Sequence, residues 1–595
     1  MKPKAPTHGT RRTSDASPSR KAVSWALVIT AAVALVTAEV FFQRHPSTTG
    51  PVTFHRDVAP IIHAHCSSCH HPGQAAPFDL LTYDDVKKRA RNIREVVERR
   101  IMPPWLPDPA DGPFVGHRSL STEQISVIQR WAEQGAPEGS TADAPTVPRW
   151  NDNWQLGKPD LVIRMAEPFA LAADGPDVYR NFVIPIPTAV RRFVKGLELQ
   201  PGNPRIVHHA FMRIDATRES QRRDEQEPGP GFGGLHTPTT AQTPQGQFLS
   251  WQPGKLHTFA PRGLAWTLET NCDLVLQTHL RPSGKPESIQ SSIGFYFTDE
   301  APTNTPFKLG LQTYAIDIPA GAIDQTIRDT YTLAADVQVL SVLPHAHYLG
   351  KELEAFATLP DGKQQRLLHI SNWDFNWQGD YQFQKPVFLP RGTTLSMVWR
   401  YDNSTNNARN PHHPPQRVRY GLQSSDEMAE LWLQVLPIRA NDLEALARYD
   451  QPRVFRAALD YNNYLLGLNP NNARAHNEIG KVQLFLGQYA EVEPSLRKAA
   501  ALDPNFDEPH YFLGVFFRMQ NRLPDAATEF RAAVQSNPNN AKAHGSLGIV
   551  LFGQGKLDDA EPHLRTALRL NPQDEIARET LEELAKTRRA KPGIK

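Results

Sequence analysis

Prolines recur every 34 residues in the last quarter of this 595-residue chain. They are Pro470, Pro504, Pro538 and Pro572, and each follows an asparagine or an aspartate. Glycines keep the same interval, at Gly480, Gly514 and Gly548. A fixed period of this length excludes a single hydrophobic core and indicates stacked copies of one supersecondary unit. The sequence therefore predicts an α-helical array over residues 447–590.

The repeated positions resemble the tetratricopeptide repeat (TPR), a pair of helices with small residues where the two helices cross. Small residues of the second helix, Ala526 and Ala560, keep the same interval. The resemblance implies a C-terminal α-helical TPR solenoid, preceded by a degenerate half-repeat and closed by a terminal helix from Asp574. Its three repeats would begin near Asn469, Asp503 and Asn537. Such solenoids bind partners on a concave surface, so a protein partner is expected here and catalysis is not.

The first 45 residues combine a basic end with an apolar run. The run is Ala22–Ala38, and the basic residues before it are Lys2, Lys4, Arg11, Arg12, Arg20 and Lys21. This order is typical of an export signal, and the run is about long enough to cross a bilayer as a helix. Residues 1–45 are therefore predicted to be a signal peptide or a single N-terminal transmembrane anchor. The rest of the chain is expected to be extracytoplasmic, in a compartment like the bacterial periplasm.

The few cysteines and many histidines of the chain indicate metal binding and not a disulfide framework. The chain has 22 histidines but three cysteines, which are too few for a disulfide framework. Cys66, Cys69 and His70 form the pattern C-x-x-C-H. Two thiols at this spacing form thioethers with the haem vinyl groups, and the adjacent imidazole ligates the iron. A redox dithiol or a zinc half-site would not require the histidine, so we expect one covalent haem c.

The C-x-x-C-H segment resembles the small cytochrome c fold, and the resemblance implies a small all-α domain over residues 52–140. Its closing helix is predicted at residues 122–134. The apolar residues of this helix share one stripe, at Ile125, Ile128 and Trp131. Proline, alanine and aspartate then predict a linker from Gly135 to Pro148.

The sixth iron ligand is expected to be Met102, which lies 32 residues after His70. A thioether ligand raises the haem potential, which suits electron donation to copper. Three histidines near the motif are the alternatives, namely His63, His65 and His71.

Short alternating apolar runs bounded by proline and glycine occupy residues 150–440. Examples are Leu161–Met165, Phe193–Leu199 and Ile293–Phe297. This pattern is typical of β-sandwiches, and the block is large enough for two. Lysine and arginine number 65 against 63 aspartates and glutamates, so the net charge of +2 gives no indication of a nucleic-acid partner.

Histidines in this block occur in groups that suit metal ions. His208 and His209 are adjacent, and His279 lies in a later strand-like run. Neighbours on a strand point to opposite faces, so His208 and His209 reach one metal only at a bulge or through different ring nitrogens. His345 and His347 form H-x-H, which on a strand would project both imidazoles from one face.

With the segment Ser424–Met428, these groups resemble the copper type II, ascorbate-dependent monooxygenases, the family of peptidylglycine α-hydroxylating and dopamine β-monooxygenase. The resemblance covers about residues 170–436. Its most specific pieces are H-A-H-Y-L-G-K at 345–351 and S-S-D-E-M at 424–428. It implies two all-β jelly-roll sandwiches with one copper each, at residues 150–305 and 306–440.

By the matching positions, the resemblance assigns an electron-storing copper to His208, His209 and His279. It assigns the catalytic, oxygen-binding copper to His345, His347 and Met428. The ligand chemistry agrees, because a thioether beside two imidazoles favours Cu(I). Three histidines with an open position also suit zinc, whereas methionine is a poor zinc ligand.

The chain departs from the family where the peptide enzyme binds a substrate carboxylate. Those positions read Leu343, Glu430 and Trp432 here, so a carboxylate-terminated peptide is not the expected substrate.

Two further groups of residues in this block have alternative interpretations. Aromatic side chains at Trp373, Phe375 and Trp377 would either line a pocket or fill a sandwich core. The pair His412-His413 lies among prolines and asparagines, and we interpret it as part of a solvated loop.

These features predict a copper-dependent monooxygenase that uses O2 to hydroxylate a C–H bond of an unknown organic substrate. The fused haem is expected to replace or relay the reductant or redox protein that such an enzyme needs. The alternative is a haem- and copper-binding protein for electron transfer or sensing, which hydroxylates nothing and docks through its TPR repeats.

Overall fold

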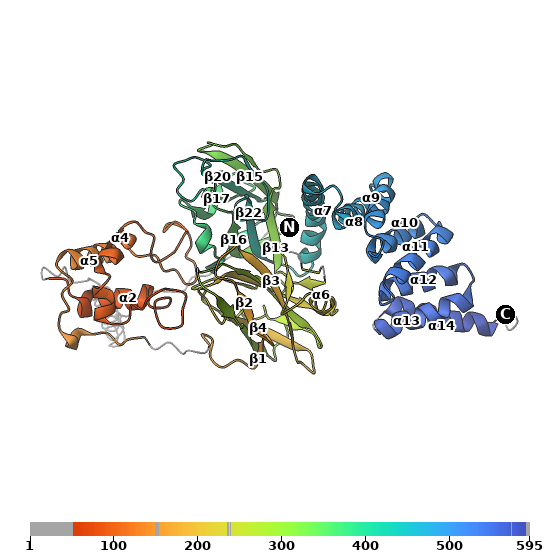
Figure 1. Ribbon diagram of the computed structural model, residues 1–595, viewed down its shortest axis with the longest axis horizontal. Coiled ribbons are helices and arrows are strands. Elements are labelled where there is room, and N and C mark those ends of the chain that lie inside the picture. Colours follow the sequence, from red (N-terminus) through yellow and green to blue (C-terminus); the bar gives the residue numbers. More distant parts are fainter. Residues whose placement is uncertain (1–50, 149–153, 235–236, 239, 573, 591–595) are drawn as a thin grey trace, which may run out of the picture.

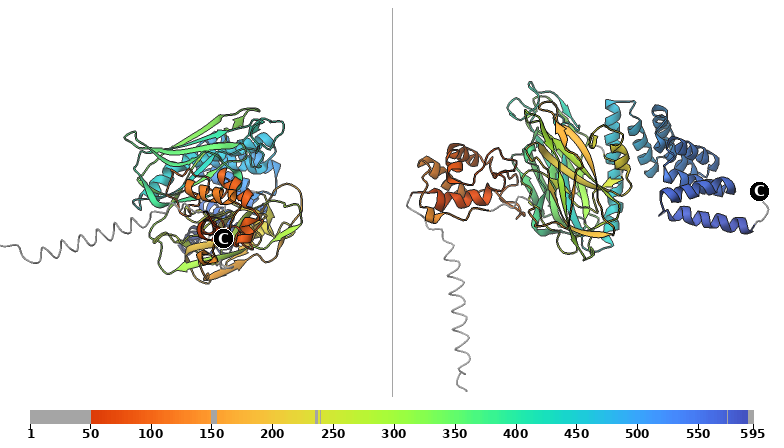
Figure 2. Two further views of the ribbon diagram at one scale, coloured as in Figure 1. Left: turned by 90° about the vertical axis from the view of Figure 1, so that its left-hand side faces the viewer. Right: turned by 60° about the horizontal axis from the view of Figure 1, so that its bottom comes forward.

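A computed structural model describes residues 51–148, 154–234, 237–238, 240–572 and 574–590. The predicted signal or anchor segment, residues 1–45, lies outside the described residues. A small helical domain and a helical array lie at opposite ends of a β-rich block (Figure 1), and the right-hand view of Figure 2 shows the same order from another direction. The chain is therefore multidomain, with a large β-rich region and a C-terminal helical array.

The small domain packs its helices around one core that includes Phe54, Ile128 and Trp131. Its elements are η1 (Phe54–Val58), α2 (Ala59–His65), α3 (Tyr83–Lys87), α4 (Ala90–Glu98), α5 (Thr122–Glu133) and η2 (Thr141–Asp143). The predicted closing helix is confirmed as α5, and its three stripe residues are buried. Ser121 and Gln124 form a capping box that fixes where α5 begins.

The first part of the predicted linker after α5 is hydrogen-bonded to the small domain and is not a free connection. The Phe54 N–H donates to the Pro137 carbonyl oxygen at 2.9 Å, and the His55 N–H donates to that of Glu138 at 3.1 Å. The first amides of a helix have no partner within it, and these carbonyls supply one. The segment after Gly135 therefore completes the small domain before it leaves it.

The first sandwich consists of antiparallel strands around its own core. Its sheets have the strand orders β1-β12-β4-β9 and β6-β3-β10-β5-β7, with β8 paired to β5 and a short β11-β2 pair. The elements are β1 (Leu161–Arg164), β2 (Phe169–Leu171), β3 (Val178–Pro185), β4 (Arg192–Gln200), β5 (Val207–Asp215), α6 (Glu219–Asp224), β6 (Phe232–Gly233), β7 (Ala241–Gln242), β8 (Ser250–Trp251), β9 (Trp266–Leu268), β10 (Asp273–Leu280), β11 (Glu287–Ile289) and β12 (Ser292–Thr298).

The second sandwich has the strand orders β13-β22-β16-β19 and β15-β20-β17-β18, with a short β14-β21 pair. Trp373 and Trp399 meet edge to face in its core, with ring centroids 5.0 Å apart. The elements are β13 (Phe307–Gln312), β14 (Asp317–Ile318), β15 (Gln325–Thr332), β16 (Val337–His345), β17 (Gly350–Thr358), β18 (Gln364–Ile370), η3 (Phe375–Trp377), β19 (Tyr381–Leu389), β20 (Thr394–Tyr401), β21 (Val418–Arg419) and β22 (Glu430–Pro437).

The C-terminal array consists of helix pairs in the predicted register. Its helices are α7 (Asp442–Leu468), α8 (Ala473–Phe485), α9 (Tyr489–Leu502), α10 (Asp507–Met519), α11 (Leu523–Ser536), α12 (Ala541–Gly553), α13 (Leu557–Leu570) and α14 (Glu575–Ala590). α7 takes the place of the expected half-repeat, and it also packs on the second sandwich. Leu446 of α7 is buried in that core, and Tyr464 meets Tyr420 with ring centroids 5.1 Å apart.

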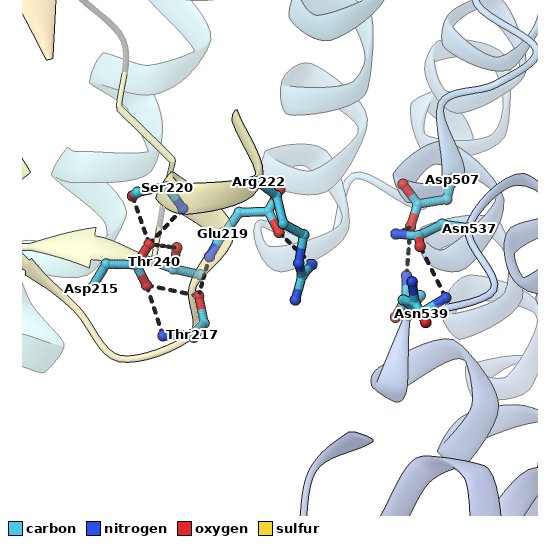
Figure 3. A network of polar contacts seen from close by, with 10 residues as sticks. Asp215, Thr217, Glu219, Ser220, Arg222, Thr240, Asp507, Asn537 and Asn539 are labelled. Atoms are coloured by element: carbon cyan, nitrogen blue, oxygen red, sulfur yellow. Dashed lines mark hydrogen bonds and ion pairs between the residues drawn. The ribbon is translucent and has the colours of Figure 1, made fainter. Parts of the chain in front are cut away.

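Figure 3 shows polar contacts on either side of the junction between the first sandwich and the array. The buried carboxylate of Asp215 accepts hydrogen bonds from the hydroxyls of Ser220, at 2.6 Å, and Thr217, at 2.7 Å. These bonds fix the entry into α6, which lies on the side of the block that faces the array. Within the array, Asp507 accepts from Asn537 at 3.0 Å, which ties successive repeats together.

One segment of the small domain belongs to the second sandwich by its contacts. We call residues 103–118 the strap. Phe114 of the strap is buried in the second-sandwich core and forms a β-bridge with Phe383. The Val115 N–H donates to the Gln382 carbonyl oxygen at 2.8 Å. The small domain is thus attached by packed side chains and backbone hydrogen bonds, beyond its covalent connection.

His369 forms a second attachment point for the strap. Its Nδ1 lies 3.1 Å from the carboxylate of Asp108, which belongs to the strap, and its Nε2 lies 2.9 Å from that of Glu352 on β17. The Asp108 N–H also donates to the His369 carbonyl oxygen at 2.8 Å. We call the contacts of His369 with Asp108 and Glu352 the latch.

No helix in the described part of the chain is both long enough and apolar enough to span a membrane.

Candidate functional site

The first histidine group lies on two paired strands of the first sandwich. In the β5–β10 pair, His279 is opposite His209 and Leu280 is opposite Val207. The register therefore shifts at this point, and His208 is the extra residue of a β-bulge. Each ring centroid of the adjacent pair lies 4.9 Å from that of His279. The bulge, one of the two arrangements expected from the sequence, is present.

The ring nitrogens of this group fit a metal ion. Ligand atoms of His208, His209 and His279 all lie within 4.8 Å of one another. The Nδ1 atoms of the adjacent pair are 3.0 Å apart, and Nδ1 of His279 is buried without a hydrogen-bond partner. Nε2 of His279 lies 2.7 Å from the Asp177 carboxylate. This bond assigns the His279 proton to Nε2 and leaves Nδ1 as a ligand atom, as in carboxylate–histidine–metal sites.

Burial keeps two imidazoles of the first group uncharged. It lowers the pKa of His208 to about 3 and the pKa of His209 well below its usual value, and the neighbouring imidazoles add to both effects. Neutral imidazole is the form that binds a metal, so protons do not compete for the nitrogens of these two residues near neutral pH.

The second group differs from the expected arrangement in its secondary structure. β16 ends at His345, so His347 lies in the turn before β17 and not on a strand. The prediction that both side chains project from one strand face is therefore wrong. The physical reason is that the His347 N–H donates to the Glu427 carboxylate and to no neighbouring strand. The imidazoles still lie together, with ring centroids 5.2 Å apart.

A buried carboxylate joins the segments that carry the second group. Glu427 is fully buried and accepts hydrogen bonds from the backbone N–H groups of His347, Leu349 and Met428 at 2.8 to 2.9 Å. Burial raises the pKa of Glu427 to about 8, although these donors oppose the effect. The carboxylate thus holds the turn after β16 beside the segment before β22, and places the backbone of Met428 near that of His347.

Hydrogen bonds also orient the two imidazoles of the second group. Nδ1 of His345 bonds to Oε1 of Gln378, whose amide nitrogen donates to the Phe375 carbonyl oxygen at 3.0 Å. That second bond fixes which end of the Gln378 amide faces His345. Nδ1 of His347 donates to the Asp426 carbonyl oxygen at 3.1 Å. Both rings therefore keep Nε2 for a metal ion.

The aromatic ring of Phe375 lies between the two groups. Its centroid is 5.0 Å from that of His208 and 5.4 Å from that of His347. Of its two aromatic neighbours in sequence, Trp373 is fully buried in the second-sandwich core and Trp377 lines a cavity. Both sequence interpretations therefore hold, each for a different residue.

The other histidine pair of the second sandwich is split between two environments. His413 is exposed, as expected of a solvated loop. His412 is half-buried instead, and its Nε2 lies 3.3 Å from the carbonyl oxygen of Ser425.

In the small domain, the C-x-x-C-H motif directly follows α2. Burial raises the pKa of Cys66 to about 12, which keeps its thiol protonated. Nδ1 of His70 lies 3.0 Å from the Phe78 carbonyl oxygen. This contact assigns the proton to Nδ1 and leaves Nε2 for an iron, so the histidine fits its predicted role.

The candidates for the sixth iron ligand have different surroundings. Each of the three nearby histidines has a ring nitrogen 3.1 to 3.2 Å from a backbone carbonyl oxygen, at His63, His65 and His71. Met102 is half-buried in the turn after α4 and leads directly into the strap. One such contact does not exclude a histidine as an iron ligand, as His70 itself shows, so the role of Met102 stays a prediction.

A cavity of about 320 Å³ lies where the strap and the two sandwiches meet. It is lined by Trp105 of the strap, by Lys255 and His257 of the first sandwich, and by Gln378 and Asp380 of the second. Lys255 and Asp380 form an ion pair at 2.9 Å. Gln378, which lines this cavity, is also the residue that orients His345.

Three residues that support the histidine groups were missed by sequence reasoning, namely Asp177, Gln378 and Glu427. Asp177 is 102 residues from the histidine it contacts, so no local pattern marks it. Glu427 does lie inside S-S-D-E-M, and a carboxylate next to an expected metal ligand was the available signal. Gln378 follows the aromatic segment and carries no signal of its own.

Comparison with known proteins places the C-terminal part only. The tetratricopeptide repeat family model matches residues 477–541 and 517–575. No curated protein matches the chain.

Similar solved structures also cover this part. A crystal structure of MamA is 24% identical, covers 23% of this chain and 83% of that one, and has a TM-score of 0.22. The first TPR of Spaghetti (RPAP3), bound to an HSP90 peptide, is 22% identical with coverages of 19% and 91% and a TM-score of 0.19. The Arabidopsis OM64 TPR domain is 19% identical with coverages of 19% and 95% and a TM-score of 0.19. By the family match, residues 477–575 form a tetratricopeptide repeat array, which implies a surface for protein partners.

Proposed function

We propose that the chain is an exported copper monooxygenase that draws electrons from its own c-type haem. The observation that carries the proposal is the first histidine group, where a β-bulge brings together three imidazoles, two half-buried and one buried. Two of their nitrogens, Nε2 of His208 and Nδ1 of His279, are buried without partners. Leaving such nitrogens unpaired costs free energy unless a ligand binds there, and neutral imidazoles suit copper.

The residues of the chain have distinct roles in this proposal. Bound copper would supply O2 activation and hydroxylation of a C–H bond. Asp177 keeps the proton of His279 on Nε2, and Gln378 keeps that of His345 on Nδ1. Glu427 holds the backbone of the second group in place. One copper would be held by His208, His209 and His279, the other by His345, His347 and Met428, and the haem by Cys66, Cys69, His70 and Met102.

The remaining parts fit the same proposal. Residues 1–45 would direct export and anchor the chain in a membrane, and the TPR array would bind a protein partner. O2 and an organic substrate would meet at the second group. Without the family's carboxylate-binding residues, that substrate is not expected to carry a terminal carboxylate.

Metal analysis with optical and EPR spectra of the purified protein tests the proposal. The chain should be produced in an export-competent host with haem-attachment machinery and copper. We expect one covalent haem and two coppers per chain. One zinc and no copper, after copper-replete expression, would contradict the proposal.

Single-residue variants assign each site. His209→Ala and Met428→Ala should each remove or weaken one copper and spare the other, whereas His413→Ala, an exposed histidine, should change neither. Cys66→Ala with Cys69→Ala should abolish covalent haem. Met102→Ala should keep haem but lower its potential, and the exposed Met519 provides the control substitution Met519→Ala.

The position of Phe375 favours electron transfer without hydroxylation as a second candidate. An aromatic ring in contact with both histidine groups suits transfer between two metals. The two candidates differ in whether O2 consumption rises when an organic substrate is added to the reduced, copper-loaded protein.

A further inference from the structure

We propose that residues 374–381 connect the C-x-x-C-H motif to His345, so that electrons from the small domain enter at the second histidine group. From there they pass to the first group. This inference rests on the proposed haem and copper sites, and it concerns the order in which the two groups receive electrons from the small domain.

The path begins where the motif contacts the first sandwich. A Cβ atom on Gly254 would lie 3.0 Å from Sγ of Cys69 and 2.8 Å from Nη1 of Arg118. Nη2 of Arg118 donates to the Gly254 carbonyl oxygen at 2.9 Å. Gly254 adopts a φ of +77°, which an L residue rarely adopts. The backbone thus approaches the second cysteine with no side chain between them.

The same loop contacts residues 374–381. Nε2 of Gln252 lies 3.3 Å from the position that a Cβ atom on Gly379 would take. Nζ of Lys255 lies 2.9 Å from both carboxylate oxygens of Asp380. Gln252 and Lys255, on either side of Gly254 in sequence, therefore lie beside two consecutive residues of the segment.

Within the segment, the path continues to the second group through a hydrogen bond. Gln378, next to Gly379, bonds through Oε1 to Nδ1 of His345. Beyond this point, Phe375 contacts His208 of the first group at a centroid distance of 5.0 Å. Electron tunnelling is faster through bonds and hydrogen bonds than across van der Waals gaps. The hydrogen-bonded connection to His345 therefore precedes the ring contact with His208.

The transfer is balanced in electrons and moves no atoms. A ferrous haem held by Cys66, Cys69 and His70 would give up one electron and become ferric, and a Cu(II) ion held by the second group would accept it and become Cu(I). The next electron would follow the same path after the first had passed to a copper held by the first group. No bond forms or breaks in these steps, and no proton has to move.

Anaerobic flash photoreduction of the fully oxidised protein tests the order. Haem absorbance follows the electron after the flash, and freeze-quenched EPR shows which copper signal disappears first. His209→Ala leaves copper in the second group alone, and haem should reoxidise at the wild-type rate. His347→Ala leaves copper in the first group alone, and reoxidation should slow by about an order of magnitude. The reverse result would overturn the proposed order.

Two glutamine variants test the route. Gln252→Ala removes the side chain that lies beside Gly379 and should slow haem reoxidation several-fold, with copper content and EPR spectra unchanged. Gln384→Ala is the matched control, because Gln384 lines the same cavity and bonds to the Phe114 carbonyl oxygen of the strap, away from His345. Equal rates in both variants and wild type would overturn the route. A wild-type protein without haem or copper would overturn the proposed function as well, so the two failures are distinguishable.

Discussion

The two histidine groups hold their imidazoles by different means. In the first group, strand pairing sets the positions, because His279 is opposite His209 and the bulge adds His208. In the second group, a strand end, a turn and a separate segment are held together by the carboxylate of Glu427. Many backbone hydrogen bonds hold the first group in position, whereas the second group depends on one side chain. A single substitution should therefore affect the second group far more.

Glu427→Ala tests this difference with the largest expected effect. The substitution leaves three buried N–H groups without their acceptor, and each costs about 1–3 kcal/mol. We expect the free energy of unfolding to fall by more than about 3 kcal/mol and copper to be lost from the second group. Denaturant unfolding and metal analysis of the same preparation measure the two effects. The first group should keep its copper.

Glu198→Ala is the matched control for this substitution. Glu198 is also buried and accepts hydrogen bonds from backbone N–H groups, those of Gln155 at 2.7 Å and Leu156 at 3.1 Å, but it lies on β4, which carries no residue of either histidine group. It should leave both metal affinities unchanged. Equal loss of copper from both groups in Glu427→Ala would mean that the groups are not held independently.

Asp177→Ala tests the first group and should have a smaller effect. The strands keep their register, so the imidazoles stay in place, but His279 loses the partner that fixes its proton and raises its basicity. We expect the metal affinity of the first group to fall about 10–100-fold, with the second group unchanged. Competition with a chelator of known affinity measures this.

The exposed Asp174 provides the control for the Asp177 substitution. Asp174→Ala changes the same net charge in the same loop and should leave the affinity at its wild-type value. If both variants weaken binding equally, long-range charge and not the contact with His279 is responsible.

Features set by residues close together in the sequence can be predicted from it, whereas contacts between residues far apart in the sequence cannot. The repeats follow from a period in the sequence, and α5 follows from its apolar stripe. The bulge at His208 is one of two arrangements that follow from the expectation that adjacent strand residues share one metal. The strap carries no such pattern, because Val115 pairs with Gln382 through backbone atoms that every residue has. Long-range partners such as Asp177 need the fold itself.

The smallest expected effect is the pH dependence of the latch. The latch joins the strap to the second sandwich and does not involve the first. Burial lowers the pKa of His369, but the hydrogen bonds with Glu352 and Asp108 and their negative charges outweigh it, so the pKa is raised overall. Protonated His369 therefore contributes its full stabilisation of the docked strap at pH values below the usual histidine pKa. This stabilisation is lost as the pH rises through the raised value.

Hydrogen exchange of the strap amides at two pH values, one on each side of this range, measures the effect. Exchange of every amide accelerates with pH, so the comparison is made on protection factors, which correct for that intrinsic change. We expect the protection factors of the strap to be lower at the higher pH, by less than about 1 kcal/mol, because such pairs are partly screened by solvent. Amides of β5 and β10, which carry the first group, should show no corresponding change in protection. His369→Gln should remove the pH dependence, and its persistence in that variant would exclude the latch as the cause.

The strap also sets an order of events during biosynthesis. A chain emerges from the ribosome N-terminus first, so Phe114 is made long before Phe383, its partner in the second-sandwich core. Until β19 has emerged, the small domain has nothing to dock on, and Gly254 does not yet cover Sγ of Cys69. Under the proposed function, an enzyme that joins haem to this thiol would therefore have open access during that interval. Assembly of the sandwiches then closes it.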